Sequence, residues 1–102
     1  MTTAPLASIV VAVLDEAENV ESVCDEIVRA MAHWGAFEIV WVDDGSRDDT
    51  PARLAAIADH DPRVRLIRHE RRCGKSQAVR TGVVAARGIW IATLDGDGQN
   101  DP

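Results

Sequence analysis

The chain has 102 residues, of which 46% are hydrophobic and 27% charged, and its formal net charge at pH 7 is −6. This composition predicts a folded globular domain, and the length excludes a second one. The negative charge argues against general nucleic-acid binding. The longest apolar run, Ile9 to Leu14, is shorter than the roughly 20 residues that span a bilayer. We therefore expect a cytoplasmic chain. Any contact of the full-length protein with the cytoplasmic face of a membrane is expected to be peripheral or to lie outside these residues.

Strands and helices are predicted to alternate along the chain. Residues 8–14 form a nearly continuous β-branched run, which is typical of a strand buried on both faces. From Asn19 onward apolar residues recur at three- and four-residue spacing, which indicates an amphipathic helix that ends before Gly35. Thr50 and Pro51 indicate a second helix start, with the Thr50 hydroxyl as N-cap. Further strands are predicted over residues 37–42, 64–68 and 89–94, and a third helix between Gly74 and Gly88.

This alternation predicts an α/β fold with a Rossmann-like, doubly wound parallel sheet of four strands and three helices. We take the strand order as 3-2-1-4, because it is the commonest arrangement of such sheets. The tryptophans Trp34, Trp41 and Trp90 are predicted to be core or packing residues.

Acidic residues follow three of the four predicted strands. Ligands of open parallel sheets bind outside the carboxyl ends of the strands, so these residues are expected to face one crevice. A single such pair would be explained by turn formation or helix capping, whereas three pairs on one edge favour a ligand site. The pairs are Asp15 and Glu16, Asp43 and Asp44, and Asp95 and Asp97.

The last pair is separated by one glycine, Gly96, which allows a tight turn. Two carboxylates on one loop are suitable ligands for Mg²⁺ or Mn²⁺. Magnesium completes its shell with water and substrate phosphates, so Asp95 and Asp97 are enough protein ligands if the substrate is a nucleoside diphosphate. The Asp-x-Asp spacing alone is common by chance.

Two further segments have alternative interpretations. Asp43-Asp44-Gly45-Ser46 can hold a ribose hydroxyl or base edge, or can form a plain Asx-capped turn. Gly74-Lys75-Ser76 is similar to a phosphate-binding P-loop, but His69 stands where the required first glycine would be. A helix N-terminus suited to anions remains, with Lys75 and Arg72 nearby.

Seven of the eleven basic residues lie between Arg63 and Arg80, which indicates either a solvated face or a phosphate-facing patch. The cysteines Cys24 and Cys73 lack metal-binding spacing and indicate a reducing compartment. Cys73 is interpreted as an incidental loop thiol, with a more reactive thiolate as the alternative.

With these segments placed, the chain resembles the N-terminal half of a family 2 glycosyltransferase with the GT-A fold. It is most similar to the branch of dolichol-phosphate mannosyltransferases and other polyprenyl-phosphate glycosyltransferases. The form Asp-x-Asp-x-Gln-x-x-Pro is typical of that branch. The resemblance rests on the strand that leads to Asp15-Glu16, on WVDDGSRDDT (41–50), on RLIRHERRCGKSQAVRTGVVAARG (65–88) and on LDGDGQNDP (94–102).

The resemblance implies metal-dependent transfer of a sugar, with inversion, from GDP-mannose or a UDP-sugar to a polyprenyl or dolichyl phosphate or another acceptor. It also implies a role for each matching residue. Glu16 and Asp44, with Asp43 beside them, would hold the base and ribose, and Lys75 would lie near the nucleotide. Asp95, Gly96 and Asp97 would form the catalytic and metal-binding loop for ribose, diphosphate and cation, and Gln99 would line the sugar-diphosphate site.

Some positions depart from the family pattern. Ala12, Leu14 and Asp15 stand where a proline, an aromatic residue and an asparagine are usual, which affects base stacking. Gly98 replaces a commonly apolar residue after the Asp-x-Asp motif.

The family's acceptor-binding segments follow that motif, so we expect residues 1–102 to be a truncated, nucleotide-sugar-binding N-terminal part of a GT-A domain. The fourth strand would then be an exposed edge through which a homodimer can form. A nucleotide- and metal-binding module without transferase activity is the alternative. A receiver-like phosphoacceptor domain is disfavoured because it needs a fifth strand with its lysine.

Overall fold

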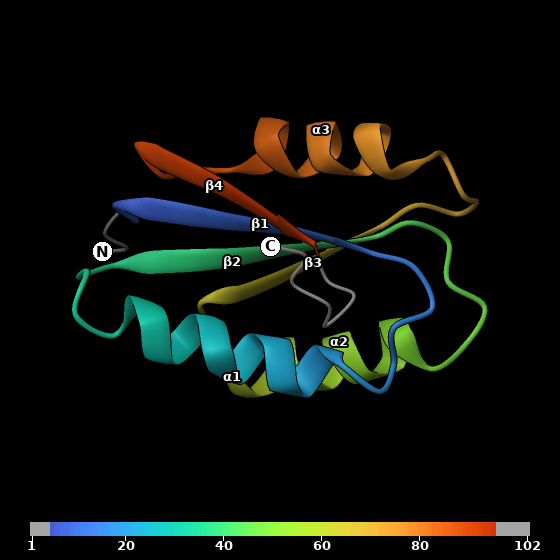
Figure 1. Ribbon diagram of the computed structural model, residues 1–102, viewed down its shortest axis with the longest axis horizontal. Helices are drawn as coiled ribbons and strands as arrows, with labels where there is room; N and C mark the ends of the chain where they lie inside the picture. Colours follow the sequence, from blue (N-terminus) through green and yellow to red (C-terminus); the bar gives the residue numbers. More distant parts are fainter. Residues whose placement is uncertain (1–4, 96–102) are drawn as a thin grey trace.

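The computed structural model describes residues 5–95, and for Asp95 the backbone only. Within that range the chain forms four strands and three helices in the predicted order (Figure 1). All predicted elements are found, with bounds that differ by a residue or two. They are β1 (Ala7–Val13), α1 (Val20–Met31), β2 (Phe37–Asp43), α2 (Thr50–His60), β3 (Val64–Arg68), α3 (Lys75–Ala85) and β4 (Trp90–Asp95).

The strands form one sheet in the order β3-β2-β1-β4, and every neighbouring pair is parallel. The predicted fold class and strand order are therefore confirmed. Helices α1 and α2 cover one face of the sheet, and α3 covers the other (Figure 1). Among the described residues no helix is both long enough and apolar enough to cross a membrane.

The central strands β1 and β2 are buried along their whole length, as the apolar run predicts. Because successive strand residues point to opposite faces, each strand contributes to two separate apolar clusters. Ile9 and Val11 pack in the cluster beneath α1 and α2, whereas Val10 and Val42 pack beneath α3. Gly82 allows α3 to approach closely, since a Cβ atom there would lie 2.3 Å from Cγ1 of Val10.

The prediction for the tryptophans is wrong at two of three positions. Trp41 is fully buried on β2, but Trp34 is 56% and Trp90 is 64% exposed. Trp34 lies beyond the end of α1, and Trp90 lies on β4, which is an edge strand in the described part of the chain. Hydrophobicity predicts burial only where another element covers the residue.

The cap of α2 also differs from the prediction. Asp49, not Thr50, occupies the N-cap position, and the Thr50 backbone N–H donates to Asp48 Oδ1 at 2.9 Å. The Thr50 hydroxyl instead accepts a hydrogen bond from the backbone N–H of Glu16 at 2.9 Å. Thr50 therefore joins the segments that follow β1 and β2.

Candidate functional site at the carboxyl edge of the sheet

The three acidic segments lie at one edge of the sheet. In the strand register Val13 pairs with Asp43, and Ala12 pairs with Asp95, so β1, β2 and β4 end nearly level. The structure thus brings together the backbone positions of the predicted pairs, up to Asp95. Gly96, Asp97 and Gln99 lie outside the described residues, and their assigned roles stay predictions.

Asp15 and Glu16 connect the turn after β1 to the turn after β2. The Asp15 backbone N–H donates to Ser46 Oγ at 2.8 Å, and Asp15 Oδ1 accepts from the Arg47 backbone N–H at 2.8 Å. Asp15 has a φ of +52°, a left-handed conformation that aspartate tolerates better than most residues. The Glu16 carboxylate accepts from Asn19 Nδ2 at 2.6 Å.

Asp43 is fully buried and shapes the turn after β2. Its carboxylate accepts hydrogen bonds from the Ser46 backbone N–H at 3.2 Å and from the Ser46 hydroxyl. Gly45 is required in this turn, because its φ is +79° and a Cβ atom would lie 2.6 Å from the backbone nitrogen of Arg72. These are the contacts of the capped turn that the sequence left as an alternative.

Asp44 is 3% exposed and holds the loop over residues 69–74, which we call the β3–α3 loop. Its Oδ1 accepts from the Cys73 backbone N–H at 2.8 Å and lies 2.9 Å from His69 Nδ1, and its Oδ2 accepts from the Gly74 N–H at 3.0 Å. Burial opposes ionisation of Asp44, but these hydrogen bonds outweigh it and lower the pKa of the carboxyl. The carboxylate therefore stays charged and fixes the loop to the end of β2.

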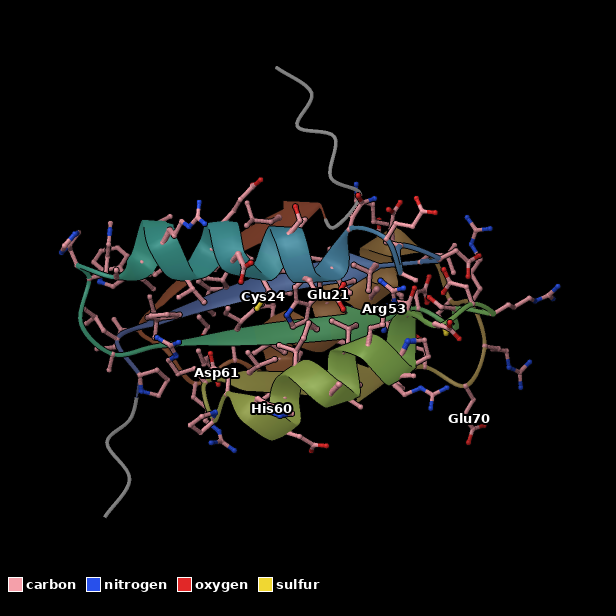
Figure 2. All side chains as sticks on the ribbon, turned by 90° about the horizontal axis from the view of Figure 1, so that it is seen from below. Glu21, Cys24, Arg53, His60, Asp61 and Glu70 are labelled. Atoms are coloured by element: carbon pink, nitrogen blue, oxygen red, sulfur yellow. The ribbon has the colours of Figure 1, made fainter. Side chains whose placement is uncertain are left out.

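A cleft of about 530 Å³ opens between the loops that follow β1, β2 and β3. Figure 2 labels Glu70 on this side of the molecule. The lining carries three guanidinium groups against two carboxylates, which makes the cleft locally basic in an acidic protein. The lining residues are Leu14, Asp15, Gly45, Ser46, Arg47, Glu70, Arg71 and Arg72.

Some arginines of the basic segment form ion pairs and others line the cleft, and the choice between a solvated face and a phosphate-facing patch stays a prediction. Arg63 forms an ion pair with Asp61 at 2.8 Å, and Arg65 forms one with Glu38 at 2.9 Å, so both act in the fold. Arg71 and Arg72 line the cleft. The sequence singles out Arg72 but not Arg71 or Arg47, and the pair of arginines close to Gly74 was the available signal for Arg71.

Lys75 is the first residue of α3, directly after Gly74, whose φ is +102°. The predicted helix N-terminus is therefore present next to the β3–α3 loop.

One cluster of potential metal ligands is found among the residues the structure describes. The ligand atoms of Asp44, His69 and Cys73 all lie within 4.8 Å of one another. Sequence spacing did not reveal this cluster, because Asp44 is contributed from a distant segment. The predicted Mg²⁺ or Mn²⁺ ligands are other residues, Asp95 and Asp97. The Asp95 side chain and Asp97 lie outside the part of the chain that the structure describes.

The sequence model of the family 'Glycosyl transferase family 2' matches residues 8–102 of this chain. The chain belongs to glycosyltransferase family 2. The family predicted from the motifs is therefore confirmed. The match includes all three acidic segments and all the residues that line the cleft.

Two relatives show which members of family 2 this chain is similar to. It is 53% identical over 78 residues to the succinoglycan biosynthesis protein ExoO of Rhizobium meliloti, a match to 72% of this chain and 22% of the relative. It is 34% identical over 97 residues to the dodecaprenyl-phosphate galacturonate synthase of Rhizobium johnstonii, a match to 93% of this chain and 29% of the relative. The second name confirms the predicted similarity to polyprenyl-phosphate glycosyltransferases. The chain spans less than a third of the length of these relatives.

A solved glycosyltransferase has the same arrangement of strands and helices. It is the mannosyltransferase PcManGT of Pyrobaculum calidifontis, in complex with GDP-Man and Mn²⁺. The superposition has a TM-score of 0.81 at 28% identity and covers 94% of this chain and 28% of the other. The GT-A fold predicted from the motifs is therefore confirmed.

Proposed function

We propose that this chain is the donor-binding part of a metal-dependent, inverting glycosyltransferase. The donor would be GDP-mannose or a UDP-sugar, and the acceptor a polyprenyl or dolichyl phosphate or another nucleophile. The observation that carries the proposal is the basic cleft at the carboxyl edge of a family 2 sheet. The named substrates of the galacturonate synthase and of PcManGT support it.

The cleft would hold the nucleotide part of the donor. Arg71 and Arg72 supply positive charge for the anionic ligand, and Asp15 and Ser46 supply polar groups at the opposite wall. Asp44 would position the two arginines, because its carboxylate holds the loop that carries them. Direct donor contacts by Glu16, Asp43 and Asp44 stay predictions of the family resemblance.

The diphosphate and its cation would lie beside the cleft, next to β1 and β4. Asp95 ends β4 opposite Ala12 of β1, so the backbone of the metal-binding loop starts at the correct edge. Asp95 and Asp97 would hold Mg²⁺ or Mn²⁺, which when bound neutralises charge that develops on the leaving diphosphate. Lys75 and the N-terminus of α3 would favour the phosphates, and Gln99 would line the sugar-diphosphate site.

A lipid-phosphate acceptor is ionised at neutral pH and therefore demands little of a general base. Because the chain spans under a third of its relatives, we place acceptor binding in the segments those longer proteins add. The same observation favours a second candidate function, a nucleotide- and metal-binding module that performs no transfer alone.

Calorimetric titration tests the donor site. GDP, UDP, GDP-mannose and a UDP-sugar are each titrated with and without Mn²⁺, and we expect one nucleotide to bind in a metal-dependent manner. Asp97→Ala should abolish the metal dependence. The double change Arg71→Ala and Arg72→Ala should weaken binding about tenfold or more, since each charge-assisted contact contributes about 1.5 to 3 kcal/mol.

Arg53→Ala is the matched control, because Arg53 is an exposed residue that pairs with Glu21 between α1 and α2 and does not line the cleft. Binding that is independent of metal, or unchanged in the double arginine variant, would contradict the donor-site proposal. Transfer of sugar to a polyprenyl phosphate by this chain alone would exclude the pure binding module.

A further inference from the structure

We propose that Asp44, His69 and Cys73 form a binding site for a zinc-type transition-metal ion that closes the β3–α3 loop onto the end of β2. The site is distinct from the Mg²⁺ or Mn²⁺ site expected at Asp95 and Asp97, and it does not depend on the proposed glycosyl transfer. It rests on the convergence of a carboxylate from the turn after β2 with an imidazole and a thiol from the β3–α3 loop.

The ligand types select the metal. A thiolate and an imidazole favour Zn²⁺ and similar ions, whereas Mg²⁺ and Mn²⁺ prefer oxygen ligands. Three protein ligands leave a fourth, tetrahedral position for water. The ion would be reached from the side of Cys73, which is exposed, whereas the Asp44 side chain is 5% and the His69 side chain 14% exposed.

The distances are close to those of a tetrahedral site. Bonds of about 2.1 Å to nitrogen and oxygen and about 2.3 Å to sulfur set the ligand atoms roughly 3.4 to 3.6 Å apart. His69 Nδ1 and Asp44 Oδ1 are 2.9 Å apart and would separate slightly. Cys73 Sγ, which lies within 4.8 Å of both, would give up its 3.4 Å contact with the Arg71 carbonyl and move inward.

The groups around the ligands already hold them in orientation. The Thr81 hydroxyl donates to the Gln77 carbonyl at 3.0 Å and lies 2.9 Å from His69 Nε2, so its oxygen can accept a hydrogen bond from that nitrogen. The tautomer with its proton on Nε2 would present Nδ1 to the metal, as outer hydrogen bonds do for most ligating histidines. The backbone N–H groups of Cys73 and Gly74 orient the Asp44 carboxylate in the same manner.

Binding of the ion releases protons from the ligands. The ion replaces the thiol proton of Cys73 and needs a lone pair on His69 Nδ1, while the carboxylate of Asp44 is already ionised. Neither oxidation nor reduction is involved. The product is a cross-link between the end of β2 and the segment before α3.

Cobalt titration of the metal-free chain tests the site. We expect a thiolate-to-cobalt charge-transfer band that saturates at one equivalent and disappears when Zn²⁺ is added. Cys73→Ser should abolish the band and weaken Zn²⁺ binding at least about tenfold, as loss of a metal contact does. Cys73 is exposed, so this change should leave the thermal unfolding of the metal-free chain unaltered.

Cys24→Ala is the matched control, because Cys24 is a buried cysteine on α1, which Figure 2 labels on the face away from α3. That variant and Asp97→Ala should both retain the band, and Zn²⁺ should protect Cys73 from alkylation by iodoacetamide. The proposal is overturned if the wild-type chain gives no thiolate band, if Cys73→Ser keeps it, or if Asp97→Ala loses it.

Discussion

At the scale of single residues, Glu38 shows how a buried charge is used to close the end of the sheet away from the cleft. It is 5% exposed on β2 and accepts hydrogen bonds from Ser8 Oγ at 2.6 Å, the Arg87 backbone N–H at 2.7 Å and Arg65 at 2.9 Å. Burial opposes ionisation of Glu38, but these donors outweigh it and lower the pKa of the carboxyl. The segment after α3 is thereby fixed to β1 and β2.

This arrangement predicts a pH-dependent contribution to stability. Because the pKa of Glu38 is lower in the folded chain than in the unfolded one, its contribution is complete above about pH 5 and is lost as the pH falls through the folded value. Glu38→Gln should lower the free energy of unfolding at pH 7 by about 2 kcal/mol, since it leaves Arg65 without its carboxylate. Urea unfolding between pH 7 and pH 3 measures both effects.

The difference between the wild type and Glu38→Gln should shrink at low pH, because protonation removes the same charge in the wild type. Glu26→Gln, on the exposed side of α1, provides a control with no such difference. A constant difference between wild type and Glu38→Gln across this pH range would show that the charge is not the cause.

At the scale of elements, the β3–α3 loop depends on a side chain from another strand. Asp44 at the end of β2 accepts the backbone N–H groups of Cys73 and Gly74, and the arginines that line the cleft lie in the same loop. A loop that makes few apolar contacts is ordered mainly by such hydrogen bonds. The position of the basic wall of the cleft is therefore set by β2.

Asp44→Asn should loosen this loop without unfolding the sheet. The amide loses the negative charge and at least one acceptor, so we expect faster hydrogen exchange at the Cys73 and Gly74 amides and an unfolding free energy lowered by about 1 to 3 kcal/mol. Exchange at the central strands, for example at Val10 and Val40, should follow only the global change in stability. Unchanged exchange at Cys73 and Gly74 would contradict the role of Asp44 as the anchor.

At the scale of the whole molecule, the two faces of the sheet are covered by helices but the β4 edge is open in the described part of the chain (Figure 1). Ile89 and Trp90 at the start of this edge are 78% and 64% exposed. An exposed apolar edge strand is a surface for pairing with another strand. The relatives are more than three times as long as this chain. In a protein of that length, another segment can cover the β4 edge.

We expect the isolated chain to self-associate through β4. Trp90→Lys should shift a concentration-dependent dimer toward monomer in sedimentation velocity, because a lysine on an edge strand opposes strand pairing. Trp34→Lys, which removes an exposed tryptophan that follows α1 and is not part of β4, is the matched control and should leave the dimer intact. A monomer at all concentrations, or equal effects of the two changes, would contradict the edge-pairing homodimer.

Much of the fold could be predicted from the sequence because the signals are local. The β-branched run of β1 and the three- and four-residue spacing in α1 each reflect which side chains face the core, and a parallel sheet follows from their alternation. The position of Asp43 at a strand end could be predicted in the same way. The exposure of Trp34 and Trp90 could not be predicted, because it depends on which elements cover them.

The sequence by itself therefore determined the α/β class, the strand order as the commonest one, the family and the edge at which the acidic segments meet. Only the tertiary structure decided what those side chains contact. Asp44 reaches Cys73 across 29 positions of the chain, and its carboxylate is engaged by backbone N–H groups, which no residue pattern displays. Contacts between distant loops depend on how the turns direct each side chain, so the basic cleft and the cluster of Asp44, His69 and Cys73 emerge only in three dimensions.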